Sequence, residues 1–125
     1  MIMLAAILGF VSPTDMPRVV EAIEMAENTP WTHAGGGLQF TQRTWREETS
    51  MPYARAKDRE TAKGIAVRRL NRHAHAFAAL GIQPTAYLLG SAWNKGFKGA
   101  LTLYYQKRKC EYGDRVQNLY VAYTK

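Results

Sequence analysis

The residue best placed to do chemistry is Glu27, a carboxylate at the end of a predicted helix. A polar turn and three consecutive glycines follow it, and then the short apolar run Leu38-Gln39-Phe40. Apolar residues precede Glu27 at helical spacing, with Ile23 four positions and Val20 seven positions earlier. Glu27 therefore continues the inward-facing stripe of this helix, and a carboxyl in that position can act as a general acid.

Two features of the position would disfavour the ionised carboxylate of Glu27. The carbonyl end of a helix already carries partial negative charge. Burial beside Val20 and Ile23 would also penalise a charge. A glycosidase needs a carboxyl that is protonated near neutral pH, and this position suits one. A surface glutamate at a frayed helix end explains the position alone equally well.

The elements that must position Glu27 are mostly helical. Apolar spacing, prolines and capping residues predict a single domain of residues 1–125 with about six helices. Leu38-Gln39-Phe40 alternates as a short strand does, which predicts one small strand-and-turn region near residues 35–41. The fold class is therefore mainly α. The predicted helices cover about residues 13–27, 42–48, 58–81, 85–94, 98–108 and 114–123.

The composition limits the class of protein. A net charge of +7 and a pI near 9.8 favour an anionic partner: nucleic acid, an acidic membrane surface or an anionic wall polymer. The single cysteine, Cys110, excludes an internal disulfide and a multi-cysteine metal site, and we expect it to be packed. Residues 1–11 are apolar but too short to span a bilayer, and a first core helix is favoured over an export signal.

Four sequence pieces occur in a recognisable order: Glu27-Asn28, then Gly-Gly-Leu-Gln-Phe-Thr at 36–41, Ala-Trp-Asn-Lys-Gly at 92–96, and 112–120. This order resembles the lytic transglycosylase branch of the lysozyme-like superfamily and is close in pattern to goose-type lysozymes. In that family a Glu-Ser pair ends a helix, and a Gly-Leu-Met-Gln-Ile strand, an Ala-Tyr-Asn-x-Gly turn and a Tyr-Val helix follow. The glycine-rich run also resembles the resuscitation-promoting factors. The match spans most of residues 13–123 and implies an α+β lysozyme-like fold.

The resemblance also implies roles for individual residues. Glu27 corresponds to the single catalytic acid/base, and Gln39 to a strand glutamine that lines the sugar-binding groove. Asn94 corresponds to the turn asparagine that contacts substrate near the acid, and Trp93 replaces the family's tyrosine. Tyr112 corresponds to the tyrosine that opens the last helix and reaches toward the active site.

The chain departs from the family pattern around the acid. Asn28 stands in place of the serine, the segment from Glu27 to Leu38 is shorter than in most relatives, and the strand lacks its methionine. The first two departures bear on substrate selection more than on the acid. Trp31 lies in the shortened loop, where stacking on a sugar ring and core packing explain it equally well. Core packing is the better explanation for Trp45.

The implied reaction cleaves the β-1,4 bond between N-acetylmuramic acid and N-acetylglucosamine in peptidoglycan, without a metal or cofactor. Glu27 would protonate the glycosidic oxygen and then act as base while the muramyl C6 hydroxyl attacks C1, which forms a 1,6-anhydro end. A hydrolase would instead need a positioned water or a second carboxylate, for which Glu47, Glu48 and Asp58 are candidates. Anhydro-forming cleavage is preferred. The resemblance implies a monomer in the cell envelope, periplasmic, secreted or phage-associated, acting on glycan strands.

Two other functions remain open. A lysozyme-like module without turnover could bind glycan or another protein, and the shortened loop would favour it. A small helical nucleic-acid binder would fit the net charge and the cluster of Arg68, Arg69 and Arg72, although no nucleic-acid motif is recognisable. A solvated surface is the better explanation of that cluster. His73 falls on an apolar helix stripe and is expected in the core.

Overall fold

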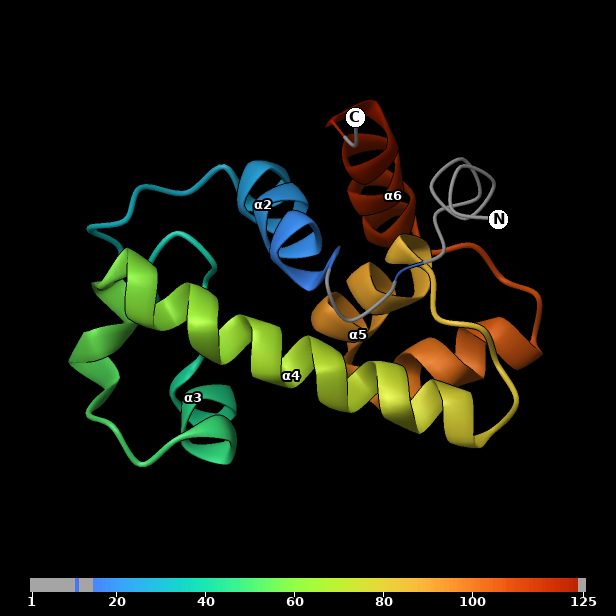
Figure 1. Cartoon of the computed structure of the whole chain (residues 1–125), viewed down its shortest axis with the longest axis horizontal. Coiled ribbons are helices and arrows are strands. Elements are labelled where there is room, and N and C mark those ends of the chain that lie inside the picture. The colour runs from blue at the N-terminus through green and yellow to red at the C-terminus, as the bar shows by residue number, and fades with distance from the viewer. Residues whose placement is uncertain (1–10, 12–14, 124–125) are drawn as a thin grey trace.

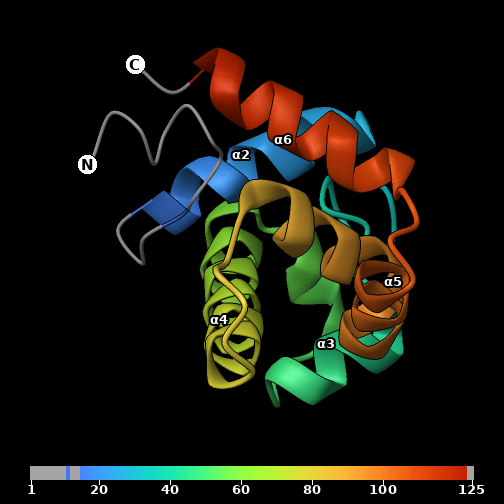
Figure 2. The same ribbon diagram turned by 90° about the vertical axis from the view of Figure 1, so that its right-hand side faces the viewer.

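The computed structural model describes residue 11 and residues 15–123, and within this part the protein is mainly helical. Its five α-helices are α2 (Met16–Glu27), α3 (Gln42–Glu48), α4 (Arg59–Ala79), α5 (Ala86–Tyr105) and α6 (Glu111–Tyr123), with a 3-10 helix η2 (Tyr53–Lys57). Helices α2 and α6 pack together on one side of α4 and α5, and α3 lies toward the opposite side (Figure 1). The view turned by 90° shows the same arrangement (Figure 2). The first core helix expected within residues 1–11 lies almost wholly outside the described residues.

Side-chain caps explain where two of the helices begin. The Thr41 hydroxyl accepts a hydrogen bond from the Thr44 N–H at 3.1 Å, and Thr85 accepts one from the Leu88 N–H at 3.1 Å. Such caps satisfy backbone donors that have no partner within the helix. The predicted helix at 42–48 is therefore confirmed. Asp58 is the N-cap residue of α4, but its side chain makes no capping hydrogen bond.

Helix α5 accounts for the difference between six predicted helices and the five described. Separate helices were expected at 85–94 and 98–108, with an interruption between them. The backbone does leave the helical conformation at Gly96, where φ is 79° and ψ is 162°, but the helix resumes at once on the other side. A positive φ is accessible to glycine at little cost, which lets α5 bend at this residue.

The predicted strand near residues 35–41 is wrong. Residues 31–39 form consecutive turns and a bend, and no strand occurs in the part of the chain that the structure describes. Gly36 and Gln39 both have positive φ, 71° and 58°, which an extended strand cannot contain. The Phe40 N–H donates to the Gly35 carbonyl at 3.0 Å and closes the turn. Leu38 still reaches the core, carried there by this turn.

Helices α5 and α6 cross closely because each has a glycine at the contact. A Cβ added at Gly90 would lie 2.8 Å from the Val116 Cβ, and one added at Gly113 would lie 2.7 Å from the Tyr87 carbonyl oxygen. Only glycine allows this approach. Because Gly113 follows Tyr112 directly, the crossing also fixes where the Tyr112 side chain leaves α6.

Several expectations about the core are confirmed. Trp45 is fully buried and its indole N–H donates to the Met51 carbonyl oxygen at 2.9 Å. Cys110 is buried as a packed thiol, and His73 lies in the core beside the Phe97 ring. Within the described residues, no helix is both long and apolar enough to cross a membrane.

Candidate functional site

Glu27 is the last residue of α2, as the sequence predicts, and its side chain is half-buried. The helix ends because Asn28 takes the left-handed conformation, with φ of 49°, and donates its N–H to the Glu24 carbonyl at 3.0 Å. Asparagine tolerates this conformation better than most residues. Asn28 thus forms a left-handed cap at the end of α2.

Tyr112 is the direct partner of the Glu27 carboxylate. Its hydroxyl donates a hydrogen bond to Glu27 Oε2, across 85 residues of sequence. Burial and the hydrogen bond to Glu27 raise the pKa of the Tyr112 hydroxyl well above its ordinary value. The hydroxyl therefore keeps its proton over the whole physiological range and remains a donor to the acid.

Glu27 lines a cavity of about 400 Å³ together with three other predicted site residues, Gln39, Trp93 and Asn94. These residues come from the end of α2, the glycine-rich turn and the middle of α5. Gly96 also lines the cavity, so the bend in α5 forms part of its wall. The remaining lining residues are Phe40, Thr41, Thr44 and Arg69.

A short chain of hydrogen bonds ties Gln39 to the end of α2. The Gln39 amide donates to the Thr29 hydroxyl at 2.8 Å, and that hydroxyl donates to the Glu27 backbone carbonyl at 3.0 Å. The Trp93 ring is held edge-to-face against Phe40, with centroids 5.3 Å apart. The cavity is therefore built on fixed side chains rather than on free loops.

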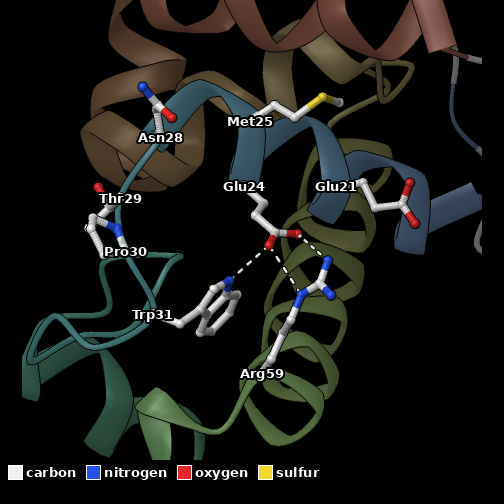
Figure 3. A pocket seen from close by; sticks show the side chains of 8 residues that line it. All are labelled: Glu21, Glu24, Met25, Asn28, Thr29, Pro30, Trp31 and Arg59. Atoms are coloured by element: carbon white, nitrogen blue, oxygen red, sulfur yellow. Dashed lines mark hydrogen bonds and ion pairs between the residues drawn. The ribbon is translucent and has the colours of Figure 1, made fainter.

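The structure places Trp31 away from the other predicted site residues, in a second hollow of about 730 Å³ (Figure 3). Its indole N–H donates to Glu24 Oε2 at 2.9 Å, and Arg59 pairs with the same carboxylate at 3.1 Å. The ring packs so closely under the glycine turn that a Cβ at Gly37 would lie 2.6 Å from Trp31 Nε1. This packing explains why the turn needs glycine.

The larger hollow is the weaker candidate for chemistry. Burial alone would raise the pKa of Glu24, but hydrogen bonds from Arg59 and Trp31 outweigh it and lower that pKa. Glu24 is thus an ionised, fully engaged partner of Arg59 (Figure 3). Glu27 has no cationic partner of that kind among the described residues, which makes its cavity the candidate site.

None of the three candidates for a second carboxylate lines the Glu27 cavity. Glu47 pairs with Arg43 on the surface at 3.6 Å, and Asp58 accepts hydrogen bonds from Arg55 and Thr61. Glu48 is buried, where Arg69 and Arg72 both bind its Oε2. Among the lining residues of the cavity, all of them described, Glu27 is the one acid.

The sequence interpretation missed Arg69. The basic cluster was interpreted as a solvated surface, but the Arg69 side chain is only 11% exposed and lines the cavity. Its burial depends on Glu48, which lies 21 residues away on α3, so the periodicity of α4 holds no signal of it.

The expectation of a core position holds for His73, although its Nδ1 has no hydrogen-bond partner in the described part of the chain.

Comparison with known proteins gives no further assignment. No family model, no curated protein and no solved structure matches this chain.

Proposed function

We propose that this protein is a lysozyme-like muramidase that cuts the MurNAc–GlcNAc bond of peptidoglycan as a lytic transglycosylase. The observation that carries the proposal is the cavity in which Glu27, Gln39, Trp93 and Asn94 meet. Their sequence motifs are the ones that resemble the family, and they come from three separate stretches of the chain, at residue 27, residue 39 and residues 93–94. A chance resemblance of separate short motifs would not require them to share one cavity.

The proposed mechanism uses Glu27 twice. Its protonated carboxyl gives a proton to the glycosidic oxygen, and the C1–O bond to the leaving GlcNAc breaks. The resulting carboxylate takes the proton of the muramyl C6 hydroxyl as that oxygen bonds to C1, which forms the 1,6-anhydro end and restores the acid. Tyr112 binds Oε2 and so holds the carboxyl group in place. The lack of a second acid in the cavity lining favours this route over hydrolysis.

The other lining residues suit a glycan. The Gln39 and Asn94 amides can exchange hydrogen bonds with sugar hydroxyl and N-acetyl groups, and the Trp93 ring offers an apolar face to a pyranose. The net charge of +7 favours approach to an anionic cell wall. A location in the cell envelope or on a phage particle follows from the proposal.

The test is digestion of purified peptidoglycan, with mass spectrometry of the released fragments. We expect anhydro-muropeptides from the wild type and none from Glu27→Gln. Glu21→Gln is the matched control, because it makes the same change on the exposed face of α2, outside the cavity. Reducing ends would identify a hydrolase instead. Binding without release would identify a module without turnover, and full activity of Glu27→Gln would refute the site.

A further inference from the structure

Arg69 is the one cation among the residues that line the Glu27 cavity. It comes from α4, on a wall different from those of Glu27 and Gln39. With 11% of its side chain exposed, Arg69 has lost most of its hydration. A guanidinium in such a site gains more from an anionic ligand than a solvated one does, because water screens the attraction less.

Glu48 holds Arg69 in place. Arg69 Nη1 donates to Glu48 Oε2 at 2.6 Å and to Glu47 Oε1 at 3.4 Å. The Glu48 side chain is itself only 5% exposed, and Arg72 binds the same oxygen from the other side. Both hydrogen bonds use Arg69 Nη1, so the Nη2 and Nε donors take no part in them. The buried pair fixes the orientation of the guanidinium.

The sequence segment that contains Arg69 is rich in positive charge. Residues 61–110, which include most of α4 and all of α5, contain no Asp or Glu. The same segment contains nine basic residues: Lys63, Arg68, Arg69, Arg72, Lys95, Lys98, Lys107, Arg108 and Lys109. Arg43, Arg69 and Arg72 share the two carboxylates of Glu47 and Glu48, so this ion-pair network carries one net positive charge.

We infer that Arg69 is the anion-recognition residue of the Glu27 cavity and that it binds a carboxylate of the muramyl side chain. This inference rests on the proposed function. A guanidinium matches a carboxylate with two parallel hydrogen bonds. N-acetylglucosamine carries no charge, whereas the muramyl residue carries a lactyl carboxylate or, where that group is linked to a stem peptide, the carboxylates of the peptide. Arg69 therefore selects muramyl glycan over chitin-like glycan.

The test compares glycan strands that differ only in this charge. Strands stripped of peptide have free lactyl carboxylates, and methylamidation neutralises them; native and amidated peptide-bearing strands form a second pair. Loss of a hydrogen bond to a charged group lowers affinity roughly 10- to 100-fold. We expect wild-type kcat/KM to fall by that factor on amidation, mainly through KM. The pair with the larger fall identifies whether the lactyl or the peptide carboxylate is bound.

Variants of the two arginines that share Glu48 separate recognition from structure. Arg69→Gln is expected to lose the discrimination, with a raised KM on charged strands and little change on amidated ones. Arg72→Gln is the matched control, because Arg72 also binds Glu48 but is 56% exposed and does not line the cavity; it should keep the discrimination. If Arg69→Gln does not fold, Arg69→Lys keeps the charge beside Glu48 and removes the two-pronged geometry, and should discriminate less than the wild type.

Each other outcome is decisive. Equal wild-type turnover of charged and amidated strands would overturn the inference, and so would equal effects of Arg69→Gln on both. If the wild type cleaves neither, the proposed function fails. Calorimetric binding of the same strands then decides the inference separately, since a charge preference that Arg69→Gln abolishes would support it and equal binding would overturn it.

Discussion

Replacing Tyr112 by Phe removes one hydroxyl and leaves the aromatic ring, which packs against the core. The hydroxyl is the donor that binds Glu27 Oε2, so the change isolates a single hydrogen bond between two helices. Because this bond does not depend on any ligand, its contribution can be measured as stability whatever the function of the protein.

The expected loss follows from the charge and burial of the pair. Hydrogen bonds to charged groups contribute about 1.5–3 kcal/mol. Glu27 is half-buried, so water can replace the hydroxyl in part, and we expect the lower end, about 1.5 kcal/mol. The entropy of unfolding is about 2.1 cal/mol/K per residue, or roughly 0.26 kcal/mol/K for 125 residues. Tyr112→Phe should therefore lower Tm by about 6 °C.

The assay is urea denaturation of the wild type, Tyr112→Phe, Glu27→Ala and the double variant. The double-mutant cycle isolates the energy of the pair, and we expect a coupling of about 1 kcal/mol or more between the two changes. Tyr105→Phe is the control, because Tyr105 is 62% exposed and its hydroxyl should contribute nothing. A coupling within about 0.3 kcal/mol of zero would refute the bond.

Three further predictions concern pH and packing. The raised pKa of Tyr112 means that only the unfolded state loses this proton near pH 10; stability should fall as pH rises above 10, and less so in Tyr112→Phe. Burial, with Arg69 and Arg72 nearby, lowers the pKa of His73 to about 4, so stability should fall by roughly 3 kcal/mol as pH drops from 6.5 to 4. His73→Gln should remove that fall in urea titrations and the exposed His75→Gln should keep it. Gly113→Ala should lower Tm by roughly 8 °C, since its Cβ would overlap α5, whereas Gly64→Ala, in open space on α4, should raise Tm slightly; equal shifts would contradict the close crossing.

The helices could be predicted from sequence because their signals are local. Thr41 precedes α3 and caps it, and Pro30, which cannot continue a helix, correctly predicts that α2 ends near Glu27. A cap or a stripe needs only residues within one or two turns of each other. An interruption between residues 94 and 98 was predicted from equally local signals, although the backbone at Gly96 makes a bend within α5 rather than a helix end.

Features that depend on distant partners could not be predicted. The alternation of Leu38-Gln39-Phe40 suits a strand, but packing of the turn against Trp31 places Gln39 in the left-handed region instead. Arg69 looked solvated because nothing near it in sequence indicates the buried Glu48. The sequence also could not show that the cavity has no second acid. That depends on where α3, which carries Glu47 and Glu48, lies relative to Glu27.

The bond between Glu27 and Tyr112 has a consequence for the timing of synthesis. A nascent chain that has emerged only as far as α5 already contains Glu27, Gln39 and Asn94, but it lacks the helix that binds the acid. The carboxylate gains its donor only when α6 docks, and Tyr112 follows Glu27 by 85 residues in the chain. The ribosome-bound chain therefore holds an unfinished site, and a glycan-cutting activity built on it would begin only after translation has passed Tyr112.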